Sequence, residues 1–290
     1  DCPSSIDSWD CAVNSGLIQT REDTAAGIVT TGVLNPADGT ISPIWTLSNT
    51  AAGSGDNEFD RLNATDLHPT SQVAYGVVSF ANANGFNGGI EQTYFIRFDS
   101  DNIEFVYEID TKPGDTRGIA FDGAFTSTGD FYYTPDDDNL YRLPNPDGVT
   151  GYSDRSNANI PADPSVLVTA MPAGGDITSA EIDLGNGQAT YIFSLSTSPG
   201  TYYFNVYDVA ANQLYEFNSL QMADGTLVTS STFGGHYRVT DAAGTSIFFS
   251  GNQSGEILKV DLSTVNLNDV NQTVVFNNAG SMELTGANDG

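Results

Sequence analysis

The chain has 290 residues, and its 37 acidic residues against 9 basic ones give a formal net charge of −28. Such a charge repels phosphate backbones and argues against nucleic acid as a partner. No run approaches the roughly 18 consecutive apolar residues of a membrane span, so we expect no membrane insertion.

The first segment contains the two cysteines of the chain, Cys2 and Cys11, with eight residues between them. This spacing can close a small disulfide loop. A zinc site is the less favoured reading, because it would need more ligands and the histidines His68 and His236 lie far off in the sequence. The chain starts at Asp1, which is typical of a mature secreted form or a part of something longer. We therefore predict an extracellular protein, secreted or at a cell surface.

Three sequons, at Asn63, Asn252 and Asn271, would accept N-linked glycans in a eukaryotic secretory pathway. Chance matches are expected in a chain so rich in Asn, Ser and Thr. Asn63 also falls at a predicted strand start, where burial would prevent its modification.

The strand pattern repeats along the chain and is clearest over residues 117–143, which read as strand, turn, strand, turn, strand. Apolar, aromatic and alternating segments are separated there by turns rich in Gly, Asp and Pro, as in one blade of a β-propeller. Four such units are predicted, at 61–110, 116–170, 176–220 and 234–279. Helical periodicity is nearly absent.

The two ends of the chain complete a further unit. Residues 281–290 look like the first strand of a blade, and residues 1–60 supply the cysteine loop and the remaining strands, at 16–20, 27–34 and 40–47. Pairing of the ends would close a ring and remove free sheet edges. We predict one all-β domain over 1–290, a propeller of five four-stranded blades closed by a composite blade. Six blades are the alternative, if the loops at 145–165 or 220–232 contain extra strands.

Several segments carry a family resemblance. A His-Pro-Thr sequence at 68–70 precedes Ala-Tyr-Gly-Val at 74–77, and similar strand sequences occur at 129–133, 138–143 and 252–261. They resemble the repeats of secreted or cell-surface β-propellers over about 60–280. The resemblance implies a module for adhesion or assembly, including extracellular filaments. It transfers no functional residue to this chain.

The innermost strand of each blade should line a central channel, where propellers can bind ligands. The main candidates for that lining are Asn63, Asp66, Arg117, Glu181, His236 and Arg238. Thr178 and Glu283 are two further candidates on the predicted inner strands. Arg117 with Glu181 could form a carboxylate-binding or catalytic pair. More often such residues satisfy each other and ordered water.

Few residues of the chain match the sequence pattern of a known class of enzyme. A glycosidase would need paired carboxylates, for which the inner strands offer Asp66, Glu181 and Glu283. A lactonase-like hydrolase with a channel calcium would use Asn63, Glu181 and Glu283. No Gly-x-Ser-x-Gly elbow with a nearby histidine is present. We therefore expect a protein that is not an enzyme.

Two acidic clusters, Asp99 with Asp101 and Asp136 with Asp138, offer the hard oxygen ligands that calcium prefers. Neither has the spacing of an EF-hand loop, and both fall at predicted turns, where Asp is favoured anyway. We expect no cofactor, with calcium as the alternative.

The leading hypothesis is a non-catalytic module that binds extracellular proteins, glycans or copies of itself, in adhesion, a matrix or a surface filament. One alternative is a secreted hydrolase with its site at the channel mouth. Another is a lectin with one pocket per blade, although the outer-strand aromatics are unevenly placed: Tyr94, Tyr141, Tyr202 and Tyr215.

Overall fold

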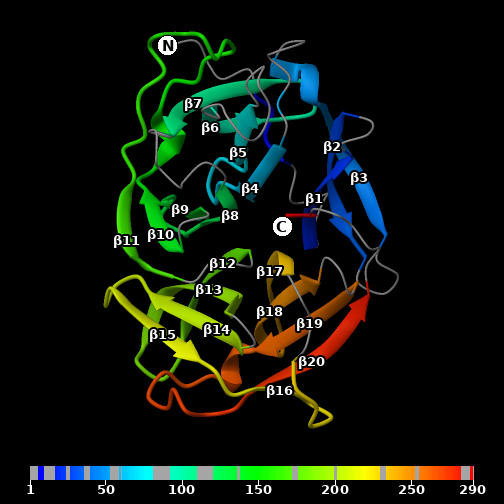
Figure 1. The fold of residues 1–290 in the computed structure, drawn as a ribbon, viewed down its shortest axis with the longest axis vertical. Helices are drawn as coiled ribbons and strands as arrows, with labels where there is room; N and C mark the ends of the chain where they lie inside the picture. Colours follow the sequence, from blue (N-terminus) through cyan, green and yellow to red (C-terminus); the bar gives the residue numbers. More distant parts are fainter. Residues whose placement is uncertain are drawn as a thin grey trace.

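Five sheets are arranged around a common centre in the computed structural model (Figure 1). The residues that it describes are 6–9, 17–23, 27–35, 40–52, 59, 61–80, 92–109, 120–135, 138–171, 176–198, 201–228, 233–251, 255–281 and 288–289. In this part of the chain no helix is long and apolar enough to cross a membrane.

Four blades follow one another along the chain, each with its first strand at the centre of the ring. The first blade consists of β4 (Arg61–Leu67), β5 (Ala74–Phe80), β6 (Gln92–Phe98) and β7 (Ile103–Ile109). The second consists of β8 (Ala120–Phe125), β9 (Phe131–Pro135), β10 (Asn139–Leu143) and β11 (Val166–Ala170). The third consists of β12 (Ile177–Asp183), β13 (Gln188–Ser198), β14 (Thr201–Asp208) and β15 (Gln213–Phe217).

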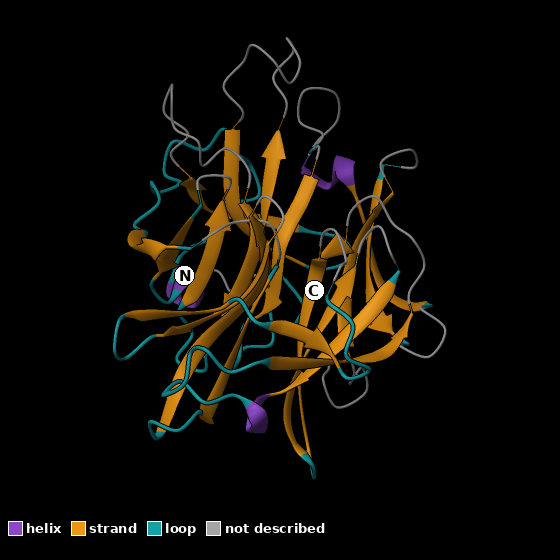
Figure 2. Cartoon of the chain, turned by 60° about the horizontal axis from the view of Figure 1, so that its bottom comes forward, coloured by secondary structure: helices purple, strands orange, loops and turns teal. Residues whose placement is uncertain are grey.

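The fourth blade has one strand more than predicted. From the centre outward it contains β17 (Phe233–Asp241), β18 (Gly244–Gly251), β19 (Glu256–Asp261) and β20 (Val274–Ser281). The additional strand is β16 (Leu220–Met222), which precedes β17 in the chain and pairs parallel to β20 at the outer edge. The 220–232 loop thus contains a strand, but it extends an existing blade and forms no sixth one. Three short 3-10 helices lie in the connections between strands (Figure 2): η1 (Asn49–Ala52), η3 (Pro146–Gly148) and η4 (Leu262–Thr264).

The closing blade is built from both ends of the chain, as predicted. It contains β1 (Leu17–Asp23), β2 (Ile28–Leu34), β3 (Ile41–Ser48) and, on the inner side of β1, β21 (Asn288–Asp289). The sequence predicted the first strand of this blade within residues 281–290, and β21 lies in that range. Ser281 itself ends β20, and residues 282–287 lie outside the described part of the chain. Among the described residues, closure rests on the pairs Thr20 with Asp289 and Arg21 with Asn288.

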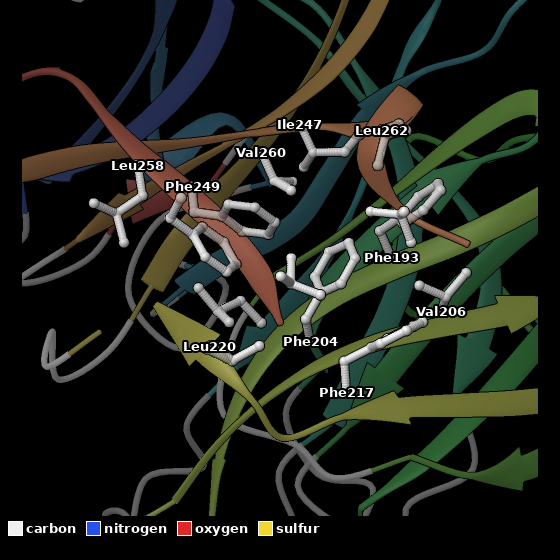
Figure 3. Close-up of a cluster of buried hydrophobic side chains, with 14 of the residues drawn as sticks. Phe193, Phe204, Val206, Phe217, Leu220, Ile247, Phe249, Leu258, Val260 and Leu262 are labelled. Atoms are coloured by element: carbon white, nitrogen blue, oxygen red, sulfur yellow. The ribbon is translucent and has the colours of Figure 1, made fainter. Parts of the chain in front are cut away.

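Aromatic side chains fill the space between neighbouring blades. Figure 3 shows the cluster between the third and fourth blades, where Phe193, Phe204 and Phe249 are fully buried. Phe204 meets Phe249 edge-on, with ring centroids 6.1 Å apart. The period-2 alternation of a strand places these side chains on one face of each sheet.

The inner strands β4 and β8 approach each other closely at Gly123. A Cβ atom there would lie 2.2 Å from Cζ of Phe131 and 2.9 Å from the carbonyl oxygen of Ala64. Because Phe131 is fully buried, neither neighbour can move away freely.

Replacing Gly123 with Ala is therefore expected to lower the free energy of unfolding by about 1 to 3 kcal/mol, the usual cost of overpacking. Gly148→Ala is the matched control, since a Cβ at Gly148 meets nothing within 4 Å. Urea denaturation measures both. Equal effects of the two substitutions would contradict the close approach of the inner strands.

The long loop at 144–165 packs against the first blade. Its residues Tyr152 and Ala162 make isolated bridges with Phe105 and Glu108 of β7. At its far end, the Tyr133 hydroxyl of the second blade donates to Asp163 at 3.0 Å. The loop therefore covers the outer edge of the first blade and ties it to the second.

Beneath this loop lies a buried ion pair. Arg97 and Glu104 face each other across the hairpin of β6 and β7, with Nε at 2.7 Å and Nη2 at 2.6 Å from Oε2 of Glu104. Nη1 of Arg97 also donates to the carbonyl oxygen of Val149 in the loop. A Cβ at Gly151 would lie 2.5 Å from the carboxylate, so the backbone of the loop covers the pair directly.

The N-terminal segment 6–9 crosses from the closing blade to the first blade. The Trp9 ring is buried and meets Trp45 of β3 edge-on, with centroids 4.8 Å apart. Trp45 in turn contacts Phe98 of β6. The backbone N–H of Trp9 donates to the carbonyl oxygen of Gln72 at 2.7 Å. The predicted disulfide partners, Cys2 and Cys11, flank this segment and lie outside the described residues.

Candidate functional site at the channel mouth

The first strands of four blades and β1 of the closing blade surround a cavity of about 300 Å³ at the centre of the ring. Ile18 of the closing blade and Leu67 of the first supply apolar walls. Asp66, Thr178, His236 and Arg238 supply polar ones. Four of the residues predicted to line a channel thus meet in one cavity.

Asp66 links two inner strands. A β-bulge between Asn63 and Asp66, with Ala64 in the left-handed region at φ 55°, shifts the register of β4 against β5. The Asp66 carboxylate accepts the backbone N–H of Leu67 at 2.7 Å and that of Phe125, from the second blade, at 2.6 Å.

Burial raises the pKa of Asp66 to about 6, although both backbone hydrogen bonds and the charge of Arg238 act to lower it. Burial wins because removing a carboxylate from water disfavours its charged form. The group therefore changes charge near neutral pH, in the range useful for a proton donor or acceptor.

This shift predicts a pH dependence of stability. Between pH 3.8 and about 6 the folded protein retains a proton that the unfolded chain releases. The free energy of unfolding should fall as the pH rises through that window, by up to about 3 kcal/mol. The difference in stability between the wild type and Asp66→Asn, which cannot titrate, measures the effect by urea denaturation at several pH values. Parallel curves for the two proteins would contradict it.

His236 is buried in the cavity wall. Its backbone N–H donates to Oδ2 of Asp176 at 2.9 Å, and its ring meets Phe249 edge-on at 4.6 Å. Burial lowers the pKa of His236 well below its ordinary value, so the ring is neutral. Neither ring nitrogen has a hydrogen-bond partner in the protein.

Arg238 lies two residues further along β17, so alternation places its side chain on the same face of the strand as that of His236. Its Nη1 donates to the carbonyl oxygen of Ser179 on β12, at 3.1 Å. The guanidinium therefore joins the inner strands of the third and fourth blades beside the cavity.

The other predicted channel residues are placed elsewhere. The exposed Glu181 accepts hydrogen bonds from Ser127 and Thr190 and does not line the cavity. Asn63 sits half-buried in the bulge of β4, also outside the lining. Arg117 and Glu283 lie outside the described residues, so the predicted pairing of Arg117 with Glu181 is not tested. Among the described residues, Asp66 is the one carboxylate in the cavity wall.

A Ser-His-Asp cluster lies between the first and second blades, and sequence reasoning did not find it. Ser71 Oγ contacts Nδ1 of His68 at 3.0 Å and donates to Asp147 at 2.8 Å. In a catalytic triad the serine and the aspartate contact opposite ring nitrogens. Here both contact the Nδ1 side, and a Cβ on Gly129 would lie 2.8 Å from Nε2. The cluster therefore holds the turn after β4 in place.

Asp99 and Asp101, proposed as calcium ligands, belong to the turn between β6 and β7. Oδ1 of the buried Asp99 accepts the backbone N–H groups of Asp101 and Asn102, and Oδ2 accepts that of Asp7. Asp138 occupies a turn with φ 57°, and Asp136 lies outside the described residues. No group of three or more possible metal ligands occurs among the residues that the structure describes.

The residues considered for glycans differ in exposure. Asn271 is exposed before β20, whereas Thr65 of the Asn63 sequon is buried and bonded to Thr20. Asn252 lies outside the described residues.

Of the four tyrosines considered for a lectin, Tyr94 and Tyr141 are buried between strands and cannot form surface pockets.

These features define the chain as a five-bladed β-propeller with a polar cavity at the centre of its ring. No family model matches it, and no curated protein matches it. Similar solved structures include the Dos1 propeller (9% identity over 87% of this chain and 60% of that one, TM-score 0.41). A second is a protein of unknown function from Desulfotomaculum acetoxidans (12% identity over 94% of this chain and 98% of that one, TM-score 0.42). A third is a streptogramin B lyase (14% identity over 86% of this chain and 67% of that one, TM-score 0.35). The chain spans three fifths of the Dos1 propeller chain.

Proposed function

We propose that this propeller is a non-catalytic extracellular interaction module that associates with a second copy of itself through the edge of strand β11. The supporting observation is the character of that edge. β11 pairs with β10 on one side alone. Its sequence, VLVTA, has no charge and no proline, and Val166 and Leu167 are 53% and 59% exposed.

The other outer strands carry features that block strand addition. The 144–165 loop covers β7, and β16 covers β20. β16 is then the outer strand of its sheet, and Leu227 of the following turn bridges its Gln221. Pro43 in β3 lacks a backbone donor, and Glu216 puts a charge on β15. Within the described part of the chain, β11 is therefore the outer strand that lacks cover, proline and charge.

Charge favours this edge as the meeting point of two copies. Two chains of net charge −28 repel each other wherever acidic side chains oppose. Antiparallel pairing of β11 with β11 brings two uncharged strands together and gives a closed, two-fold dimer. A β-bulge at Val168 interrupts the strand, so the pairing is short and the dimer weak and reversible.

Sedimentation velocity tests the proposal. The wild type should shift from monomer to dimer between about 10 and 200 μM protein, and more strongly in about 0.5 M salt, which screens the repulsion. Leu167→Lys should stay monomeric, because a lysine on an edge strand prevents pairing. Val275→Lys is the control: Val275 is 39% exposed, but its strand is paired on both sides. A wild type that is monomeric throughout, or equal behaviour of both variants, would overturn the proposal.

The extracellular setting is supported by the acidic composition and the Cys2–Cys11 spacing. Intact-mass spectrometry of protein purified from its native source tests it. A disulfide makes the chain about 2 Da lighter than the reduced form. Two free thiols in the native protein would count against secretion.

A further inference from the structure

One of the three sequons, at residues 271–273, lies in an exposed turn directly before β20 of the fourth blade. Asn271 and Thr273 are both exposed, whereas Val274, the first residue of the strand, is buried. A glycan is bulky and needs a surface position, and the sequon requires the asparagine together with the hydroxyl two residues later. Both parts of this acceptor motif are therefore open to solvent.

The turn keeps its shape without the side chain of Asn271. The backbone N–H of Gln272 donates to the carbonyl oxygen of Asp269 at 3.1 Å, and its Nε2 donates to that of Asn266 at 2.9 Å. Asn271 itself donates through its backbone N–H, to Oδ1 of Asp269 at 3.3 Å. Within the described part of the chain, no hydrogen bond uses its carboxamide. The carboxamide nitrogen can therefore be substituted without loss of a contact.

The sequon at Asn63 is blocked by the fold. Thr65 is 7% exposed, and its hydroxyl donates to that of Thr20 in the closing blade at 3.1 Å. Asn63 is half-buried in the inner strand β4, where it pairs with Val77 of β5. A bulky glycan on this strand would disrupt the packing of the inner strands. The fold thus distinguishes two sequons that look alike in the sequence.

We propose that Asn271 carries an N-linked glycan. The proposal rests on the extracellular setting proposed above, because the glycan transferase acts in the secretory pathway. Nδ2 of Asn271 attacks the anomeric carbon of a lipid-linked oligosaccharide diphosphate. A bond forms between Nδ2 and that carbon, the bond from the carbon to the diphosphate oxygen breaks, and Nδ2 loses one proton. No oxidant or reductant takes part.

Modification and self-association use different blades. Strand β11 is the outer strand of the second blade, whereas Asn271 precedes β20 of the fourth. Val270 and Val275, on either side of the sequon in the chain, are each 39% exposed. A glycan on Asn271 gives these apolar side chains a polar neighbour and leaves the β11 edge free for a second copy.

The test is secretion of the full chain from insect cells, with intact-mass spectrometry and peptide mapping before and after treatment with peptide N-glycosidase. One glycan adds about 1 to 2 kDa, and its release leaves an aspartate about 1 Da heavier than the asparagine. The peptide that contains Asn271 should show this change in most molecules. Asn271→Gln and Thr273→Ala should each lose one glycan, and Thr273→Ser should keep it, because serine also completes the motif.

The matched control is Asn63→Gln, which should leave the glycan mass unchanged. Sedimentation velocity of the wild type before and after glycan release should give the same extent of dimerisation, since β11 lies on another blade. An unmodified Asn271 in the folded, secreted chain would overturn the proposal. Equal occupancy of Asn63 and Asn271 would overturn it as well, because the burial of Thr65 would then decide nothing.

Protein purified from its native source separates this proposal from the one on which it rests. A Cys2–Cys11 disulfide together with a glycan on Asn271 supports both. The disulfide together with an unmodified Asn271 overturns glycosylation alone. Free thiols at both cysteines count against secretion and thereby against both proposals.

Discussion

Replacing Arg97 with Met should lower the free energy of unfolding by about 3 to 5 kcal/mol, as expected when a buried ion pair loses one partner. Both side chains of the pair are only 10% exposed, and the 144–165 loop covers them. The substitution removes the guanidinium but leaves the Glu104 carboxylate in the same buried position. Chemical denaturation measures the loss.

Two further variants separate charge from packing. Arg142→Met is the matched control, because the Arg142–Asp130 pair has similar geometry but its arginine side chain is 43% exposed. Exposed pairs contribute about 0 to 1 kcal/mol. The double variant Arg97→Met, Glu104→Leu should regain much of the stability, because no charge is left buried. A double variant as unstable as Arg97→Met would contradict the electrostatic explanation.

Replacing Trp9 with Ala should cost about 3 to 5 kcal/mol, the range for removal of a buried aromatic side chain. Trp9 is 1% exposed and fills the joint between the closing blade and the first blade, against Trp45. Loss of the ring removes this contact and leaves a cavity where two blades meet. Thermal unfolding and urea denaturation both report the change.

Trp9→Phe is the conservative comparison and should lose less than half as much, since a smaller ring still fills part of the space. The backbone bond from Trp9 to Gln72 is unchanged in both variants. If Trp9→Ala costs less than about 1 kcal/mol, segment 6–9 contributes little to the joint between the blades.

The blades could be predicted because their signals are local. Thr128, Gly129 and Asp130 mark one turn, and alternation in the flanking residues marks the strands on either side. The same alternation placed Asp66, His236 and Arg238 on inner strands, where they meet in the cavity. Glu181 also lies on an inner strand, but its exposed side chain bonds Ser127 of the second blade and does not line the cavity.

Pairing of the two chain ends was predicted, but other contacts between distant segments escaped prediction. Nothing near Trp9 in the sequence indicates Trp45, and nothing in β16 indicates its parallel pairing with β20. The Arg97–Glu104 pair did leave a signal: opposite charges stand at symmetric positions around the Asp99 turn, where a hairpin brings them face to face. Counting outward from predicted turns would have found it.

The two-residue strand β21 makes one joint of the ring mechanically different from the others. The blades are joined in series by the chain itself, but among the residues that the structure describes the ring closes through two residue pairs, at Thr20 and Arg21. Because β21 is antiparallel to β1, Leu17 and Asp289 lie at the same end of this short ladder. Tension applied to these two residues would therefore break the pair at Thr20 first and the pair at Arg21 second. The ring should therefore open at low force while its blades stay folded, and the amides of this joint should exchange hydrogen by local opening.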